Sequence, residues 1–147
     1  MNEITLRKAT IDDMELTFNW RNAPENRYYC IASSDLIDIT THTNWFNKIL
    51  VDKNRYLLIA EINKNPIGVL RYDIINNSAE ISIHLKPGTS GKGIGTALIV
   101  KGSAWLKDTV PSVKHIIANI LPENIPSQKA FAKAGFRTHH LCLTKDI

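Results

Sequence analysis

The sequence is poor in cysteine and has no N-terminal apolar run, and these two absences argue against a disulfide-rich protein, a metal-binding protein and a secreted protein. It contains only two cysteines, Cys30 and Cys142, which form neither a metal-binding spacing nor a set of disulfide bridges. A reduced, cytoplasmic setting is the simplest expectation, with no metal ion. The segment from Met1 to Ala9 alternates like a strand and lacks the apolar core of a signal peptide. Hydrophobic residues at 44% and charged residues at 22% are ordinary globular values, so we expect no association with a membrane.

Runs of positive charge are also absent, although the formal net charge is +4 and the pI about 9.1. The basic residues are scattered, which is a poor footprint for nucleic acid, and we expect no nucleic-acid partner. A small phosphate-bearing molecule suits a mild positive bias equally well. With 147 residues, 44% of them hydrophobic, and no repeat or linker, the chain is expected to form one domain, 1–147.

Periodicity predicts a mixed α/β sheet with flanking helices. The expected order is strand 3–8, helix from Asp12 or Asp13 to the break at Pro24, helix from Thr40 or Thr41 to about residue 50, strands 55–62, 67–75 and 80–85, helix 94–108, strand 113–121, helix 125–134 and strand 139–144. The segment 25–38 has no clear period and is expected to be a loop or a short helix. Trp20, Trp45 and Phe46 are expected in the core. The strand 113–121 is mostly apolar, as is typical of a strand buried on both faces.

The stretch around residues 80–95 is the most informative. It begins as a strand whose side chains alternate between two faces, with Ile81, Ile83 and Leu85 on one face and Glu80, Ser82 and His84 on the other. A glycine-rich loop, 88–95, then leads into an apolar helix. Such a loop can bring several N–H groups to a helix N-terminus, where unpaired donors and the helix dipole favour an anion. The stretch therefore predicts a phosphate cradle.

Two common phosphate loops do not match this stretch. A Walker A loop would need Gly at Lys86 and Ser or Thr at Gly93, and a dinucleotide fingerprint would need Gly in place of Thr96 or Leu98. The pattern that does fit is Gly-x-Gly placed shortly after a strand, where the strand ends in Leu85-Lys86-Pro87, that is, an apolar residue, any residue and proline. These residues resemble motif A of the GNAT superfamily of acetyl-coenzyme A dependent N-acetyltransferases.

A second stretch resembles motif B of the same superfamily. It runs Asn124-Ile-Pro-Ser127-Gln-Lys-Ala-Phe131-Ala-Lys-Ala-Gly135-Phe and stands at the expected distance after motif A. The resemblance covers nearly the whole chain. It implies a GNAT fold, a mixed and mostly antiparallel sheet with splayed central strands and flanking helices. The strands 80–85 and 113–121 would part, and the pantetheine arm of the cofactor would lie between them.

The resemblance also implies the cofactor and its contacts. Acetyl-CoA would be the acetyl donor, with its pyrophosphate on the N–H groups of 90–95. The amide of Leu85 would face the thioester carbonyl and stabilise its developing charge, as an oxyanion donor does. The residues expected against the cofactor are Leu85, Ser90, Gly91, Lys92, Gly93, Ile94, Gly95, Thr96, Asn124, Ser127 and Phe131.

The chain departs from the family pattern in three places. Ser90 stands where the family usually has Gln or Arg, and Phe131 stands where many members have the Tyr that protonates the leaving thiolate. Ser127 matches a Ser used by ribosomal-protein N-acetyltransferases, so we expect it to be the acid. Little sequence follows Phe136, so one of the last two strands of the family is expected to be short or to come from a second subunit of a homodimer.

Transfer of acetyl to an amine requires a base, because the attacking nitrogen must be neutral. Glu80 is the first candidate, since it matches a glutamate base of several GNAT enzymes, and His84 is the second, since its ordinary pKa suits the task. The alternative for both is a polar side chain on the open face of a strand. The choice between them stays open at this stage.

The N-terminal third contains the residues expected to bind the acceptor: Arg21, His42 and, further on, Arg71. Their surroundings resemble the branch that acetylates nucleotide-linked amino sugars, notably the 4-amino-altrosamine N-acetyltransferase of pseudaminic acid synthesis. Arg21 could pair with a diphosphate and His42 could hydrogen-bond it. The alternative for Arg21 is that it caps its own helix.

Three functions follow from these residues. The first is transfer of acetyl from acetyl-CoA to the primary amine of a nucleotide-linked 4-amino sugar, by direct attack. The second is acetylation of a protein N-terminus, as in ribosomal-protein acetyltransferases. The third is a GNAT-fold module that binds CoA without catalysis, which the residues Ser90 and Phe131 favour.

Overall fold

The computed structural model describes residues 3–147 and contains one five-stranded sheet in the order β1-β2-β3-β4-β5. All neighbouring pairs are antiparallel except β4 and β5, which are parallel. The elements are β1 (Ile4–Lys8), η1 (Ile11–Asp13), α1 (Met14–Asn22), α2 (Pro24–Arg27), α3 (Ile39–Val51), β2 (Arg55–Ile62), β3 (Asn65–Ile75), β4 (Ser78–Leu85), α4 (Ile94–Thr109), β5 (His115–Ile117) and α5 (Ile125–Lys133). The predicted α/β class and the mixed, mostly antiparallel sheet are confirmed.

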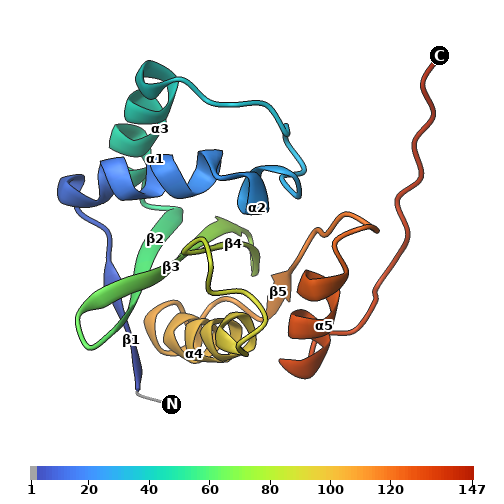
Figure 1. Cartoon of the computed structure of the whole chain (residues 1–147). Coiled ribbons are helices and arrows are strands. Elements are labelled where there is room, and N and C mark those ends of the chain that lie inside the picture. The colour runs from blue at the N-terminus through green and yellow to red at the C-terminus, as the bar shows by residue number, and fades with distance from the viewer. Residues whose placement is uncertain (1–2) are drawn as a thin grey trace.

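Helices cover both faces of the sheet (Figure 1). The helices α1 and α3 lie over one face, α4 lies over the other, and α5 lies beyond β5 beside α4. Each covered face has its own apolar cluster, because side chains alternate along a strand. The cluster under α4 includes Leu58, Leu70, Tyr72, Leu98, Ile99 and Leu106, and the cluster under α1 and α3 includes Trp20, Phe46, Ile49, Leu57, Ile59 and Val69.

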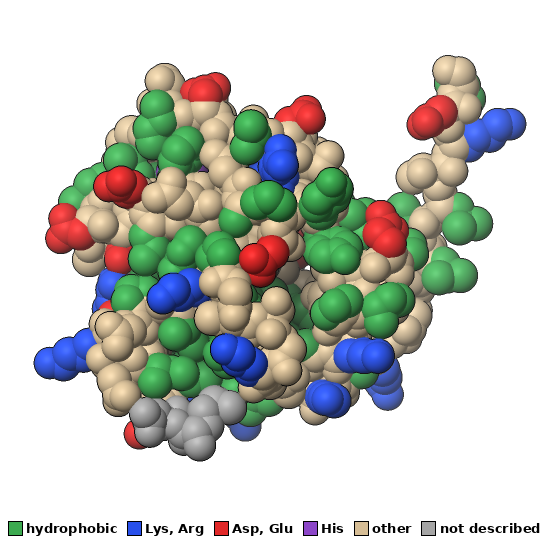
Figure 2. Space-filling model, viewed as in Figure 1, with side chains coloured by type: hydrophobic (Ala, Val, Ile, Leu, Met, Phe, Trp, Pro, Cys, Tyr) green, Lys and Arg blue, Asp and Glu red, His purple; other side chains and the backbone are tan. Residues whose placement is uncertain are grey.

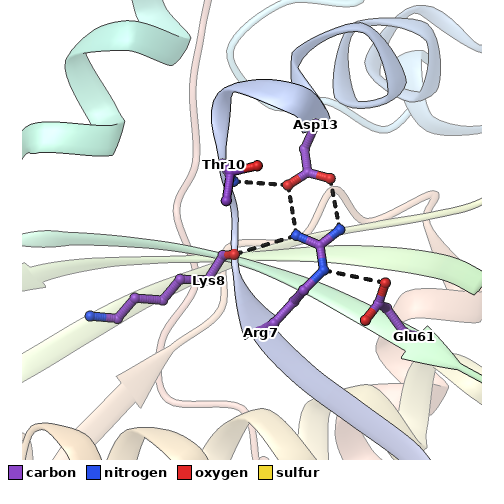
Figure 3. Close-up of polar contacts among 5 residues, drawn as sticks. All are labelled: Arg7, Lys8, Thr10, Asp13 and Glu61. Atoms are coloured by element: carbon purple, nitrogen blue, oxygen red, sulfur yellow. Dashed lines mark hydrogen bonds and ion pairs between the residues drawn. The ribbon is translucent and has the colours of Figure 1, made fainter. Parts of the chain in front are cut away.

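A partly buried ion pair joins β1 to the turn before α1 (Figure 3). Both terminal nitrogens of Arg7 donate to the carboxylate of Asp13 at 2.8 Å, and its Nε lies 3.2 Å from Glu61. The same carboxylate accepts the N–H of Thr10 at 2.8 Å, and these hydrogen bonds, those from Arg7 first, hold the pKa of Asp13 below its usual value. This corner directs α1 across the sheet, toward the open end of β4.

Two expected helix and strand boundaries need correction. The second helix begins at Ile39, because Asp38 is its N-cap and accepts the N–H of Thr41 at 2.8 Å; neither threonine is the cap. The strand expected over 113–121 is only three residues long, and Ile117 is 44% exposed. That strand is at the edge of the sheet, so it is not buried on both faces as its apolar composition suggested.

The expected last strand, 139–144, is not formed. Residues 137–147 are exposed and extended, and they run clear of the rest of the molecule (Figure 2). Leu141 and Leu143 alternate with polar residues as in a strand, but they are 82% and 88% exposed. Alternation predicts which face a strand would bury, whereas a strand also needs a bonded neighbour.

Candidate active site

The site begins where β4 and β5 part. Their pairing covers only Ser78–Glu80 against His115–Ile117, whereas β4 stays paired with β3 as far as Leu85. Backbone N–H groups alternate in direction along a strand. Because Lys86 donates to the Ile67 carbonyl of β3 at 2.9 Å, the N–H of Leu85 points the other way, into the gap. The strands therefore splay as expected, and a donor of β4 is left for a ligand.

The glycine loop closes one end of this gap. Gly91 and Gly93 have φ values of +79° and +77°, which only glycine adopts without strain. Gly93 is the N-cap of the 16-residue α4, and no side chain caps that end. The first N–H groups of α4 are therefore available to an anion, and the helix dipole adds to the attraction.

The other wall of the gap is the start of α5. The side chain of Asn124 caps this helix by accepting the N–H of Ser127 at 3.3 Å, which fixes the serine in the first turn. Phe131 is 5% exposed and meets Phe136 edge to face, with their ring centroids 4.9 Å apart. Phe131 therefore packs as a core residue while also lining the gap, and its ring has no proton to give.

One cavity of about 1570 Å³ joins these walls to the space under α1 and α3. Its volume exceeds that of a pocket for one small ligand, so it can hold two substrates at once. Lys92 and Ile94 do not line it, and Ile94 is buried in the core. The expected site residues that do line it are Arg21, His42, Arg71, Glu80, His84, Leu85, Ser90, Gly91, Gly93, Gly95, Thr96, Asn124, Ser127 and Phe131.

Polar side chains of β3 and β4 form the floor of the cavity on the α1 side. Arg71 is opposite Ser82, and the register places His84 and Glu80 on the same face at either side. Glu80 is exposed. Its Cα is about 13 Å along the strand from that of His84, at 3.3 Å per residue. His84 is thus the candidate base next to Leu85, and Glu80 lies where the strands begin to part.

His84 is held neutral by its surroundings. Burial lowers its pKa to about 4, and the positive charges of Arg21 and Arg71 act in the same direction. The uncharged imidazole can accept a proton without first losing one. A base with such a low pKa is weak, so any change that moves the charge of either arginine will alter its strength.

The two other expected acceptor residues already have partners. Arg21 is 9% exposed and donates to the carbonyls of Ser33 at 2.9 Å and Asp35 at 3.5 Å, so it holds the segment 28–37 rather than its own helix. His42 Nε2 is 3.2 Å from the Met14 carbonyl and 3.0 Å from the Thr17 hydroxyl. Burial lowers the pKa of His42, which therefore joins α3 to α1 as a neutral ring.

Sequence reasoning missed two residues of α2 that join the acceptor side to the cofactor side. The Asn26 amide donates to the carbonyl of Leu85 at 3.0 Å and to that of Trp20 at 2.8 Å. The carboxylate of Glu25 accepts the N–H of Gly88 at 3.1 Å. Fifty-nine residues separate Asn26 from Leu85, so no local pattern could have revealed this contact. The local signal was that residues 25–38 have no clear period.

Within residues 3–147, no group of three His, Cys, Asp or Glu side chains is arranged to hold a metal ion. The helices of the same residues include none with the length and apolar character needed to cross a membrane. On the face shown in Figure 2, Lys and Arg side chains are spread out and form no single patch.

Comparison with known proteins agrees with this geometry. Residues 3–137 match the family model described as an acetyltransferase (GNAT) domain. The Bacillus subtilis (strain 168) protein YwnH, provisionally named a phosphinothricin acetyltransferase, is 24% identical over an alignment of length 139 that covers 90% of this chain and 83% of that protein.

Solved structures share the fold. AAC(6')-Ib in complex with ribostamycin and coenzyme A has a TM-score of 0.83 and 21% identity, over 94% of this chain and 85% of that one. Spermidine N-acetyltransferase from Vibrio cholerae in complex with CoA and spermine has a TM-score of 0.82 and 23% identity, over 93% and 82%. A domain from Methanocaldococcus jannaschii DSM 2661 is 26% identical, with a TM-score of 0.82, over 95% and 91%.

The fold and the parted strands define a cofactor-binding α/β domain of the acyltransferase type. The match over residues 3–137 goes further: the chain belongs to the GNAT acetyltransferase family. The predicted class of enzyme, an acetyl-CoA dependent acetyltransferase, is thereby confirmed at the level of the family. The relatives named above span several acceptors and leave the nucleotide-sugar branch as a prediction.

Proposed function

We propose that this protein transfers acetyl from acetyl-CoA to the primary amine of a nucleotide-linked 4-amino sugar. The observation that carries the proposal is the continuous cavity, which runs from the glycine loop to Arg71 under α1 and α3. A donor thioester in the gap and an amine at the floor of the cavity would meet beside Leu85. Such a shared chamber suits direct transfer between two bound substrates.

In the proposed reaction the neutral amine attacks the thioester carbonyl carbon. The carbonyl oxygen gains negative charge, which the Leu85 N–H stabilises. The carbon–sulfur bond then breaks, the amide keeps the acetyl group, and the thiolate of CoA takes up a proton. One proton must also leave the nitrogen, so the site needs a base on the amine side and an acid on the sulfur side.

The positions of three side chains favour their roles. His84 is adjacent to Leu85 and faces the cavity, and Glu80 is exposed on the same face and can act through water. Ser127 is half-buried in the first turn of α5, on the cofactor wall of the cavity. We therefore assign His84 or Glu80 as the base and Ser127 as the acid.

The test is release of CoA thiol from acetyl-CoA in the presence of single acceptors. The panel comprises a uridine-diphosphate-linked 4-amino sugar, the same amino sugar without the nucleotide, spermidine, ribostamycin and a short peptide with a free N-terminus. The nucleotide sugar is expected to give the highest kcat/KM. A peptide as the best acceptor would support the ribosomal-protein type, and no release with any acceptor would leave a CoA-binding module.

Variants separate the two candidate bases. Each of Glu80→Gln and His84→Gln should leave the Kd for acetyl-CoA unchanged, measured by calorimetry, because neither side chain lies on the cofactor wall. The variant that removes the base should lower kcat by at least about 100-fold. Ser127→Ala should lower kcat less, by about tenfold, since water can replace a serine as the proton donor. Full turnover in both base variants would refute the assignment.

A further inference from the structure

Two arginines, Arg55 on β2 and Arg71 on β3, lie beside the same carboxylate, that of Asp73. Of these two, Arg71 faces the cavity. Its guanidinium lies over the Trp45 ring, 5.7 Å from the centroid, and its Nε is 3.3 Å from Asp73. Its side chain is 29% exposed and lines the cavity. Among residues 3–147, no group hydrogen-bonds its two terminal nitrogens. Arg71 therefore presents two oriented donors, on a fixed aromatic platform, to whatever enters.

Arg55 is a matched partner that lacks this access. It lies over the same Trp45 ring at 5.9 Å, and its Nε donates to the same Asp73 carboxylate at 2.9 Å. It does not line the cavity. One carboxylate thus serves two guanidinium groups: it accepts a hydrogen bond from Arg55 Nε, whereas Arg71 Nε is buried near it without a hydrogen bond among the described residues. Two guanidinium groups share one carboxylate, so one positive charge is not neutralised, and Arg71 is the group of the two that lines the cavity.

A second positive charge adds to the same end of the cavity. Arg21 is buried and bonded to neutral carbonyls, with no acidic partner within 4 Å in the part of the chain that the structure describes. His84, beside both arginines, is uncharged. Glu80 is the acidic side chain on the same strand; it lies diagonal to Arg71, on the other side of Ser82 from His84, and its side chain is exposed. Together, Arg21, Arg55 and Arg71 outnumber the carboxylates of Asp73 and Glu80 on this face. The floor near Arg71 is therefore electropositive, which attracts anions and disfavours polycations.

We propose, building on the proposed function, that the acceptor carries an anionic group close to its amine and that Arg71 on the Trp45 platform is the residue that binds it. A phosphate or carboxylate would accept two parallel N–H bonds from the guanidinium. It would set the amine beside His84 and balance the excess positive charge on this face of the cavity. Polyamines such as spermine, which the Vibrio cholerae relative holds, have the wrong charge for this site.

The first experiment measures kcat/KM at saturating acetyl-CoA for one acceptor that carries the anionic group and one that lacks it. The acceptors are the uridine-diphosphate-linked amino sugar and the same sugar without the nucleotide. Arg71→Gln should lower kcat/KM for the anionic acceptor by about 30-fold, as expected for a lost charge-assisted pair, and for the uncharged one by less than about threefold. Arg55→Gln, the matched control, should change both by less than about threefold.

The second experiment separates this proposal from the choice of a nucleotide sugar. If the nucleotide sugar is no substrate, glucosamine 6-phosphate is compared with glucosamine, and glutamate with putrescine. A preference for the anionic member of each pair, lost in Arg71→Gln, would support anion binding while refuting the nucleotide sugar. Equal use of both members, or the same loss for both in Arg71→Gln, would overturn the proposal.

A binding measurement gives a readout that does not depend on turnover. Uridine diphosphate is titrated calorimetrically into protein saturated with CoA, so that the phosphate cradle of α4 is already filled. The expected result is one binding event whose Kd rises at least about tenfold in Arg71→Gln and stays unchanged in Arg55→Gln. No heat with the wild-type protein, or equal affinity in both variants, would contradict a site at Arg71.

Discussion

The two edges of β4 differ in how far they are paired. On the β3 side, eight consecutive residue pairs are in register, from Ser78 opposite Ile75 to Leu85 opposite Gly68. On the β5 side the pairing stops after three residues, at Glu80. The same residues thus build a closed edge that holds the fold and an open edge that offers unpaired backbone groups. Stability and binding are divided between the two sides of one strand.

The same contrast between a tightly packed side and an open side is found in α4 and in the glycine loop, which lie next to β4. Below the closed edge, α4 packs so tightly that a Cβ on Gly102 would come within 2.5 Å of the Tyr72 hydroxyl oxygen. Beside the open edge, the loop glycines at 88, 91 and 93 have nothing within 4 Å of a Cβ position. Substitutions in the closed region should therefore change the free energy of unfolding, and substitutions at the open edge should change turnover.

The largest expected effect comes from placing proline on each edge in turn. Leu85→Pro removes an N–H that points into the gap, so kcat should fall at least about 100-fold, the usual loss for one oxyanion donor. Ser82→Pro removes an N–H that points to β3, so the free energy of unfolding should fall by about 3 kcal/mol or more. Thiol release and urea denaturation measure the two effects. Equal losses of stability in both variants would break the comparison.

Packing below the closed edge gives the next effect. Gly102→Ala should lower the free energy of unfolding by about 1–3 kcal/mol, because the added methyl group overlaps Tyr72 and Leu70. Gly95→Ala, in the same helix, is the matched control, since its nearest contact would be at an ordinary 3.8 Å. The control should be neutral or slightly stabilising. Chemical denaturation of both variants checks this.

Tyr72 sharpens the same point. Its hydroxyl is buried, and no partner for it lies within residues 3–147. Tyr72→Phe should therefore raise the free energy of unfolding by about 1 kcal/mol, and it should restore part of the stability lost in Gly102→Ala. If the changes in unfolding free energy of Tyr72→Phe and Gly102→Ala simply add in the double variant, the Tyr72 hydroxyl is not the group that the added methyl overlaps.

A pH effect of similar size should arise from the cavity side of β4. The pKa of His84 is about 4 when folded and 6.5 in the unfolded chain, so only the unfolded chain binds this proton between those values. Stability should fall by roughly 2 kcal/mol as the pH drops from 6.5 to 4, allowing for partial exposure of the ring. Denaturation across this range should show a shallower fall in His84→Gln. An unchanged slope would mean that the ring is solvated.

One other group contributes within that window and another contributes below it. The lowered pKa of His42 acts in the same direction, so some of the slope should remain in the variant. Asp13 has a lowered pKa, and its contribution is present above 3.8 and is lost only at lower pH. Its effect is therefore separable from that of the histidines.

The smallest effect is expected from the C-terminal segment. Deletion of residues 138–147 should change the free energy of unfolding of the monomer by less than about 0.5 kcal/mol, because all of these side chains are exposed. A loss of several kcal/mol would show that the segment pairs with a strand in solution. Analytical ultracentrifugation of the full chain and of the shortened chain then tells whether that strand belongs to a second copy.

Much of the closed region could be predicted from local pattern. The strands over 55–85 have clear turns between them, with positive φ at Asn63, Lys64 and Asn76, and the helix after the glycine loop begins at the expected residue. Local alternation and turn chemistry are sufficient there, because neighbours in sequence are neighbours in the sheet.

The open region was harder to predict because its geometry depends on distant contacts. No residue near Ile117 in the sequence predicts that β5 ends there. The alternation at 141–143 is typical of a strand, but it does not indicate whether a partner strand exists. The cofactor residues that the motifs indicate stay a prediction, as does acceptor binding by Arg21, whose bonds to the carbonyls of Ser33 and Asp35 no local pattern predicted. A side chain with several donors has many possible partners, and sequence alone does not rank them.

The anchors of the segment 28–37 have a practical consequence for engineering. Asn22 clasps one end through both the N–H and the carbonyl of Ile37, and Asn26 ties the other end to Leu85. The segment 28–37 is therefore held at both of its ends by hydrogen bonds of these two asparagines. Because several of its residues line the cavity, we expect a graft that exchanges only this segment, and retains both asparagines, to change which amine is accepted while leaving the glycine loop and α5 unchanged.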